Sequence, residues 1–191
     1  VRVKSCHISS KTTYVIEQYL ILSLSNISGI GTSPDPCSDT FHGSSAASEP
    51  ETQAVQDQIL SLADETIAWL TIHTAAMAWL TPWGDVDENG ACTYPDDYAD
   101  IDRALVTAMA AVEETHATLW RWGNSCEVLY ATTGSTQDFA KVNGIKYSYT
   151  PELRGPGFSP GQTAIPRSYE ETWNGIAALL FEISAIEGYD V

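Results

Sequence analysis

The chain has 191 residues, 43% hydrophobic and 18% charged, which is enough for one globular domain with a core of its own. Nine Lys and Arg residues oppose 25 Asp and Glu residues, and the formal net charge of -16 would repel a nucleic-acid backbone or an anionic membrane surface. The longest apolar stretch, residues 14–25, is interrupted by Glu17 and Gln18 and is too short to span a bilayer. We therefore expect a monomer with no nucleic-acid partner and no membrane partner.

The first 47 residues show little regular patterning. Residues 1–28 lack a clear period, and residues 29–47 are dense in Gly, Ser and Pro, which predicts a loop. Ser48 then stands two residues before Pro50 and three before Glu51, the pattern of a capping box that opens a helix. This helix is expected to run through Val55, Ile59 and Leu62.

Two strands and a long helix are predicted next. The run "TIAWLTIH" (66–73) is short, β-branched and apolar on both faces, which is typical of a buried central strand, and a second short strand is expected near residues 77–81. Residues 98–116 place apolar side chains at helical spacing, with acids toward the start, so we expect a helix there. The apolar positions are Ile101, Leu105, Ala108, Met109 and Val112.

The last part of the chain predicts two strands and a helix. The segment "CEVLY" (126–130) is strand-like, and in the strand "KYSYTPEL" (146–153) Tyr147 and Tyr149 alternate with Ser148, Thr150 and Glu152 on the other side. A second capping box, Ser168 with Glu171, predicts a helix through the apolar stripe Trp173, Ile176, Ala177 and Leu180. Helices that alternate with strands indicate an α/β fold.

Three residues near strand ends are candidates for a site. Glu152 stands at the carboxyl end of its strand, the edge where ligands collect in α/β sheets, although an acid paired with a cation in a structural turn is the alternative. His73 ends the strand 66–73 and is either a core imidazole or a ligand or base at the same edge. Arg154 we assign to local structure. The acidic run 85–96 has the oxygen spacing of a calcium loop but no entering helix, so we interpret it as a solvated loop.

The four cysteines form an even set without a CxxC pair: Cys6, Cys37, Cys92 and Cys126. This favours disulfides and an oxidising compartment over a zinc knuckle. From the even count alone we expect Cys92 to pair with Cys126, with two unpaired buried thiols as the alternative. No basic region followed by an apolar one opens the sequence, so any signal peptide lies outside it.

Five local patterns occur in order along the chain: "SPDPCSDTFHGSSAASEPE" (33–51), "IHTAAMAWLTPWG" (72–84), "VLYATTGSTQDFA" (128–140), "KYSYTPELRG" (146–155) and "IPRSYEETWNGI" (165–176). They resemble successive segments of the zinc metallocarboxypeptidases of the pancreatic carboxypeptidase A and B type. The resemblance runs from about residue 29 to about residue 187. It implies an α/β fold with a mixed sheet and helices on both faces, truncated at its N-terminal side, and a disulfide between Cys6 and Cys37.

The resemblance also implies roles for four residues. Glu152 matches the general base, which takes a proton from zinc-bound water and passes it to the leaving amine. His73 matches the last of three zinc ligands, Tyr130 the mobile tyrosine that closes over the C-terminal residue of the substrate, and Gln137 the floor of the specificity pocket. A neutral amide at the floor leaves the side-chain preference open. One zinc ion as cofactor, peptide or protein C-termini as substrates and a secreted or extracellular location follow from the same resemblance.

The sequence also departs from the family pattern. The family supplies two zinc ligands from an upstream H-x-x-E, but the residues three places after His7, His42, His73 and His116 are Ser10, Ser45, Ala76 and Leu119. The oxyanion-stabilising arginine belongs to the same missing part. Nor does the stretch between Cys6 and Cys37 contain the Asn-Arg pair that clamps the terminal carboxylate.

These departures divide the chain into two regions. We interpret residues 1–28 as an atypical segment from a retained intron or a mispredicted exon, and residues 29–191 as the C-terminal part of a carboxypeptidase-like catalytic domain. The predicted function is zinc-dependent hydrolysis of the C-terminal peptide bond, with little or no catalysis by this chain alone. The alternatives are a non-catalytic peptide-binding module and a non-functional fragment that does not fold alone.

Overall fold

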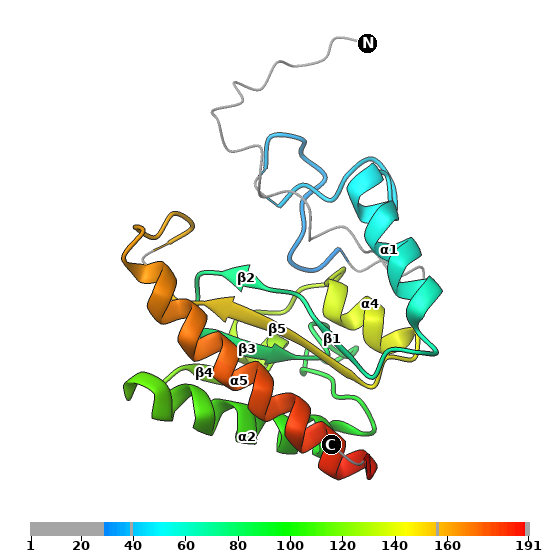
Figure 1. Cartoon of the computed structure of the whole chain (residues 1–191). Helices are drawn as coiled ribbons and strands as arrows, with labels where there is room; N and C mark the ends of the chain where they lie inside the picture. The colour runs from blue at the N-terminus through cyan, green and yellow to red at the C-terminus, as the bar shows by residue number, and fades with distance from the viewer. Residues whose placement is uncertain (1–28, 39, 156, 190–191) are drawn as a thin grey trace.

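The computed structural model describes residues 29–38, 40–155 and 157–189 (Figure 1). The predicted atypical segment 1–28, with Cys6, lies outside these residues. The elements, in chain order, are α1 (Pro50–Leu62), β1 (Ala68–Leu70), β2 (His73–Thr74), β3 (Ala78–Thr81), α2 (Tyr98–His116), β4 (Arg121–Asn124), α3 (Ser125–Val128), α4 (Thr136–Val142), β5 (Tyr147–Leu153) and α5 (Ala164–Glu187). None of the described helices is long and apolar enough to cross a membrane.

The strands form one mixed sheet in the order β1-β5-β3-β4, and β2 also pairs with β5. Both β1 and β2 run parallel to β5, whereas β3 is antiparallel to β5 and parallel to β4. β5 therefore lies at the centre of the described sheet. Its position explains why the side chains that alternate along it meet different elements on the two faces.

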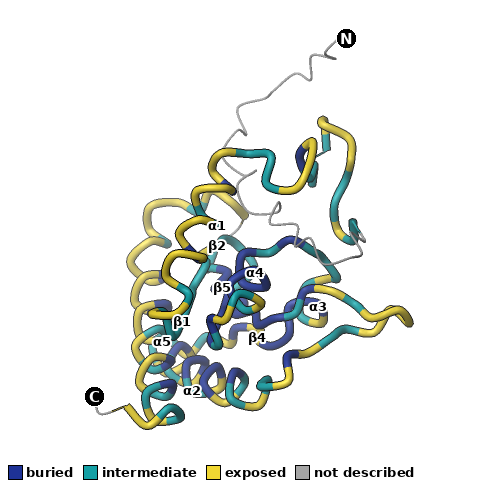
Figure 2. The backbone as a smooth tube through the Cα atoms, turned by 90° about the vertical axis from the view of Figure 1, so that its right-hand side faces the viewer, coloured by how far each residue is buried: buried dark blue, intermediate teal, exposed yellow. Residues whose placement is uncertain are grey.

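One face of the sheet is covered by α2 and α5, which pack side by side (Figure 1). Tyr147 and Tyr149 of β5 point to this face and are fully buried, together with Trp79 of β3. α2 contributes the apolar stripe that its spacing predicts, and α5 contributes Leu179 and Ile183. Figure 2 shows the buried segments of α2 against the sheet and the exposed turns on the outside.

The opposite face is covered by α1 and α4, around a smaller apolar cluster of Ile59, Phe139, Ala140 and Ile145. Trp69 of β1 is partly buried against it, on the side opposite its neighbours Ala68 and Leu70. The polar side chains of β5 face this layer. The predicted fold, a mixed α/β sheet with helices on both faces, is therefore confirmed.

Helix positions were predicted better than helix starts. The helix at 98–116 has the predicted bounds and ends at Ala117, which adopts the left-handed conformation (φ 52°) and donates its N–H to the Glu113 carbonyl. The capping box at Ser48 is wrong. Glu49 occupies the N-cap of α1 without a side-chain cap, and the Ser48 hydroxyl donates instead to the Glu49 carboxylate.

The capping box at Ser168 is wrong as well. α5 begins four residues earlier, at Ala164, after a turn in which the Ala164 N–H donates to Gly161. Ser168 is consequently inside the helix and buried. A Ser-x-x-Glu pattern cannot distinguish a cap from an interior position when the preceding residues can also form a turn.

Three expectations about the remaining elements also change. Residues 126–130 are not a strand: the strand is β4, just before them, and Asn124 caps the short helix α3 by accepting from the Glu127 N–H. Helix α4 was not predicted, although Ser135 followed by Asp138 is a capping pattern, and Ser135 does cap it. The predicted buried strand 66–73 is broken into β1 and β2, and both are only partly buried.

Candidate functional site

The register of two parallel strands brings Glu152 and His73 together. His73 of β2 is paired with Glu152 of β5, and its Nδ1 atom lies 3.4 Å from Oε1 of the carboxylate. Glu152 stands near the carboxyl end of β5, whereas His73 begins the two-residue strand β2. Because Glu152 follows the period of Ser148 and Thr150, its side chain is on the face opposite the tyrosine core.

Arg154, two residues further on, belongs to a different environment. Its Nε and Nη2 atoms donate to both carboxylate oxygens of Glu171 in α5, at 2.8 and 2.6 Å. The Glu171 side chain has no exposed surface, and the ion pair raises the pKa of the Arg154 guanidinium. The sequence assignment of Arg154 to local structure agrees with this pairing, and the acid and base that end β5 serve opposite sides of the sheet.

Gln137 enters the same region from α4 and is almost completely buried. Its Nε2 donates to the Thr81 carbonyl at 3.2 Å, and its backbone carbonyl accepts from the Ser148 hydroxyl at 2.7 Å. Its Oε1 has no hydrogen-bond partner among the described residues. These bonds attach the side chain to β3 and the backbone to β5, so its position is determined by the sheet rather than by α4 alone.

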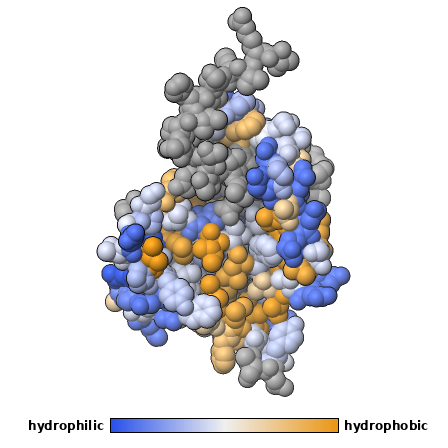
Figure 3. Space-filling model, turned by 45° about the horizontal axis from the view of Figure 1, so that its top comes forward, coloured by the Kyte–Doolittle hydropathy of each residue, from blue (hydrophilic) through white to orange (hydrophobic). Residues whose placement is uncertain are grey.

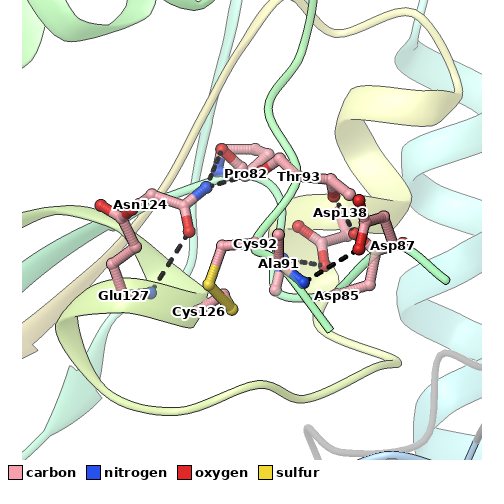
Figure 4. The surroundings of a disulfide bond; sticks show 11 residues. Pro82, Asp85, Asp87, Ala91, Cys92, Thr93, Asn124, Cys126, Glu127 and Asp138 are labelled. Carbon is pink, nitrogen blue, oxygen red and sulfur yellow. Dashed lines mark hydrogen bonds between the residues drawn. A yellow bond between two sulfur atoms is a disulfide. The ribbon is translucent and has the colours of Figure 1, made fainter. Parts of the chain in front are cut away.

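Tyr130 follows α3 and is exposed over 55% of its surface. The segment that carries it is tied to the loop 82–93 by Asn124, whose Nδ2 donates to the Thr93 carbonyl at 2.9 Å and to the Pro82 carbonyl at 3.4 Å (Figure 4). The disulfide between Cys92 and Cys126 joins the same two segments, as expected from the even cysteine count. Cys37 is also disulfide-bonded, and its predicted partner lies outside the described residues.

A third tie connects the loop 82–93 to α4. The Gly84 N–H donates to Oδ2 of Asp138 at 3.0 Å, while Oδ1 has no partner among the described residues. Burial raises the pKa of Asp138 to about 7, against the lowering effect of its hydrogen bonds and with a further rise from the charge of Asp85. α3 and α4 both contribute lining residues to the cavity described next, and the loop 82–93 is bonded to both helices. We call these three segments together the cavity wall.

The four predicted site residues, His73, Tyr130, Gln137 and Glu152, line one cavity of about 100 Å³. They come from β2, the segment after α3, α4 and β5, so only the tertiary fold brings them together. Most of the other lining residues carry hydroxyl groups: Ser125, Thr132, Thr133, Ser135, Thr136 and Thr150. These were not predicted, and the signal available was the run of Ser and Thr in "ATTGST" beside Tyr130.

The residues that the structure describes do not make up a zinc site by themselves. A catalytic zinc ion needs three protein ligands and an open position, and the described part of the chain contains no group of three His, Cys, Asp or Glu side chains placed to hold a metal. His73 stands beside Glu152, the carboxylate matched to the base. We therefore derive no chemical step through zinc for this chain. The same holds for the acidic loop among the described residues, where Asp87 accepts the N–H groups of Ala91 and Asn89 within its own turn, and these bonds lower its pKa.

Fold and site together define an α/β protein with a cavity that is lined mainly by hydroxyl-bearing residues and lies beside β2 and the carboxyl end of β5. The family model described as zinc carboxypeptidase matches residues 24–175. Carboxypeptidase B of Astacus astacus is 37% identical over 152 residues, which are 77% of this chain and 48% of that protein. Carboxypeptidase A2 of Rattus norvegicus is 34% identical over 159 residues, 81% of this chain and 36% of that protein.

A solved structure shows the same relationship. Carboxypeptidase A from Helicoverpa armigera superposes with a TM-score of 0.71 and 26% identity, over 90% of this chain and 42% of that one. The chain therefore belongs to the zinc carboxypeptidase family, as the resemblance implied. It spans less than half the length of each of these three relatives. The division of the chain at residues 28 and 29 and the individual site roles stay predictions.

Proposed function

We propose that this chain carries the substrate pocket and the general base of a zinc metallocarboxypeptidase, which removes single C-terminal residues from peptides and proteins. The observation that carries the proposal is the convergence of His73, Tyr130, Gln137 and Glu152 on one cavity. The family membership supplies the reaction class. Each of the four residues matches a distinct role in that reaction.

The roles follow from the position of each side chain. Glu152 stands at the cavity and can accept a proton from water and return it to an amine leaving group. Gln137 presents a neutral, buried surface to the C-terminal side chain of the substrate. Tyr130 is exposed beside the cavity and is able to move over a bound residue.

Hydrolysis requires groups that this chain does not supply. When bound, zinc polarises the scissile carbonyl and lowers the pKa of its water, and only His73 matches a ligand for it. We therefore expect the chain alone to bind C-terminal residues without cleaving them. This makes a non-catalytic peptide-binding module the second candidate, and the absence of H-x-x-E from the sequence favours it for the isolated chain.

A secreted or extracellular location is proposed for the parent protein. The Cys92–Cys126 disulfide and the bonded state of Cys37 support it, because such bonds persist in oxidising compartments. Peptide C-termini are the proposed partners, with the chain itself a monomer. One family relative of known structure, bovine thrombin-activatable fibrinolysis inhibitor, has been solved in complex with a tick carboxypeptidase inhibitor.

The test is a binding comparison across N-blocked dipeptides that differ only in their C-terminal side chain. We expect Gln137→Leu to shift the order of binding affinities toward dipeptides with apolar C-terminal side chains. We expect Tyr130→Ala to weaken the binding of all the dipeptides several-fold. Arg103→Met, at an exposed position on α2 away from the cavity lining, is the control. An order of affinities that stays the same in Gln137→Leu would overturn the pocket assignment.

Adding zinc distinguishes a complete carboxypeptidase from a non-catalytic peptide-binding module. We expect no release of the C-terminal residue by the isolated chain, with or without zinc. Release that a chelator abolishes, and that Glu152→Gln also abolishes, would instead show that this chain assembles a complete enzyme.

A further inference from the structure

The side-chain amide of Gln137 has one polar atom that no described residue satisfies. Its Nε2 atom donates to the Thr81 carbonyl at 3.2 Å, and because a carbonyl accepts only from the NH₂ end, this bond determines the orientation of the amide. Its Oε1 atom is buried without a hydrogen-bond partner among the described residues, and the whole residue is only 1% exposed. A buried acceptor without a donor is unfavourable, so the cavity lacks one N–H or O–H group.

The cavity offers little compensation to a charged side chain. Among the described residues that line it there is no Lys, Arg or Asp, and His73 and Glu152 stand 3.4 Å apart and face each other. A C-terminal Asp or Glu would therefore find no cation of its own, and a Lys or Arg would meet the neutral amide of Gln137. Burying a charge without a partner is costly, and the formal net charge of -16 adds repulsion against an acid.

The lining suits a side chain that is partly apolar and partly polar. It differs from the exposed apolar surface of the molecule, which Figure 3 shows as a band of hydrophobic residues between hydrophilic flanks. Leu80 and Leu129 are the two aliphatic residues among the described residues of the lining. Thr136 and Thr150 each carry a methyl group and a hydroxyl, and both residues are buried. Because a hydroxyl can donate as well as accept, such residues can pair with a carbonyl oxygen.

We propose that this cavity selects substrates whose C-terminal side chain is an uncharged carboxamide, that of Asn or Gln, and that Gln137 determines the preference. The amide N–H of the substrate side chain donates to Oε1 of Gln137, and its carbonyl oxygen accepts from a hydroxyl of the lining. Its methylene groups pack on Leu80 and Leu129. The inference rests on the proposed function, because it requires that the cavity receives the C-terminal residue of a peptide.

Other uncharged side chains fit the cavity less well. An apolar side chain of similar shape leaves Oε1 of Gln137 without a donor, and a site whose buried polar groups lose their partner rejects such a ligand. A Ser or Thr hydroxyl can donate to Oε1, but the cavity of about 100 Å³ is several times the space that one water molecule needs. A short side chain would therefore leave part of the lining uncontacted.

The test compares the affinities of the chain for N-blocked dipeptides that end in Gln, Met, Glu, Lys or Ser. Met has a length similar to that of Gln and no amide, and titration calorimetry at neutral pH gives the dissociation constants. We expect the Gln dipeptide to bind about fivefold to tenfold more tightly than the Met dipeptide, the change typical of one hydrogen bond. We expect the other three dipeptides to bind more weakly than the Gln dipeptide as well. Binding of any of the four that equals or exceeds that of the Gln dipeptide would overturn the preference.

Two variants test which residues produce the preference. Gln137→Met removes the acceptor and should abolish the difference between the Gln and Met dipeptides, and Thr150→Val removes one hydroxyl and should narrow that difference. Arg103→Met, at an exposed position on α2 away from the cavity lining, is the control and should keep the wild-type order. An unchanged difference in Gln137→Met would overturn the role of Gln137. The comparison of dipeptides on the wild-type chain needs no variant, so it decides the preference even if Gln137→Met does not fold.

Failure of this inference and failure of the proposed function give different results. Binding of the dipeptides without a preference for Gln would overturn only the carboxamide assignment. The absence of binding by any dipeptide would overturn both proposals, because the cavity would then not receive a C-terminal residue.

Discussion

The cavity wall differs from the edge formed by β1, β2 and the outer face of α5, which we call the open edge, in how its polar and apolar groups are satisfied. The wall is held by a disulfide, by the Asn124 amide and by the Asp138 carboxylate, so each of its segments is bonded to another. The open edge instead exposes Ile72, between β1 and β2, and apolar side chains of α5, and the Arg154–Glu171 ion pair lies beside them. The comparison shows that the wall is held by bonds between its own segments, whereas the edge leaves apolar side chains exposed among the described residues.

The largest effect is expected from the ion pair at the open edge. Arg154→Met leaves the Glu171 carboxylate buried without its bidentate partner, which should lower the free energy of unfolding by about 3–5 kcal/mol. Urea unfolding followed by circular dichroism measures the change. The second variant, Arg154→Met with Glu171→Gln, removes the buried charge and should recover most of the loss.

A matched ion pair on the same helix provides the control. Arg103 donates to Glu182 of α5 at 2.7 Å, but the Arg103 side chain is 61% exposed. Arg103→Met should therefore cost only about 0.2–1 kcal/mol. If the Arg103 and Arg154 variants lost similar stability, burial of Glu171 would not be the cause.

In the cavity wall, the disulfide is expected to have the next largest effect. Cys92 and Cys126 are 34 residues apart, and replacing both with Ser restores the freedom of that loop in the unfolded chain, at a cost of about 3–4 kcal/mol. The measurement is the same unfolding experiment without reductant. Because Ser125 beside Cys126 lines the cavity, dipeptide binding should weaken as well. Unchanged stability of the double variant would mean that the hydrogen bonds of Asn124 and Asp138 hold the wall without the disulfide.

The smallest of the three main effects concerns Asp138, and it depends on pH; only the Arg103→Met control is expected to change stability less. The pKa of the folded carboxyl is about 7 because of burial, whereas the ordinary pKa of an Asp side chain is 3.8, so between these values the folded chain holds one more proton than the unfolded chain. The contribution of Asp138 to stability is therefore full at low pH, falls as pH rises from about 4 to about 7, and stays low above.

Asp138→Asn removes this titration and retains an acceptor for the Gly84 N–H. The free energy of unfolding of the variant should rise relative to that of wild type as pH rises, by on the order of 1–3 kcal/mol at pH 8. The reason is that the variant has no buried carboxylate that becomes charged. Unfolding free energies of both proteins at intervals from pH 4 to pH 8 test it. A difference that is constant over this range would contradict the titration of Asp138.

Local patterns predicted the elements whose evidence is contained in one segment. The helical stripe at 98–116 and the alternation along β5 depend only on spacing, and both were confirmed. The strand expected at 126–130 was wrong because its residues form a turn of helix capped by Asn124, whose amide is held by a loop some 30 residues away in sequence. Similarly, both capping boxes were wrong because a Ser-x-x-Glu spacing carries no information on where the preceding turn begins.

The candidate site likewise has a part that the sequence predicted and a part that only the fold produced. Glu152 and His73 could be placed at strand ends from the sequence, and the resemblance matched them, with Tyr130 and Gln137, to roles in one reaction. The 3.4 Å approach of His73 to Glu152 required the parallel register of β2 and β5, and the hydroxyl lining of the cavity required α3 and α4 to meet β5. Neither can be read from periodicity, because spacing does not define pairing between distant segments.

By itself the sequence determined the class of fold, the apolar face of the helix 98–116 and the alternation along β5, because side-chain spacing encodes these locally, and its five ordered motifs carried the resemblance to the family. It also determined that the zinc ligand pair H-x-x-E is absent from this chain. Only the tertiary structure decided that Glu152 turns to the cavity while Arg154 turns to Glu171, and that an interior-type strand lies at an open edge. The physical reason is that burial and hydrogen-bond partners depend on which distant segments are present to pack against a face.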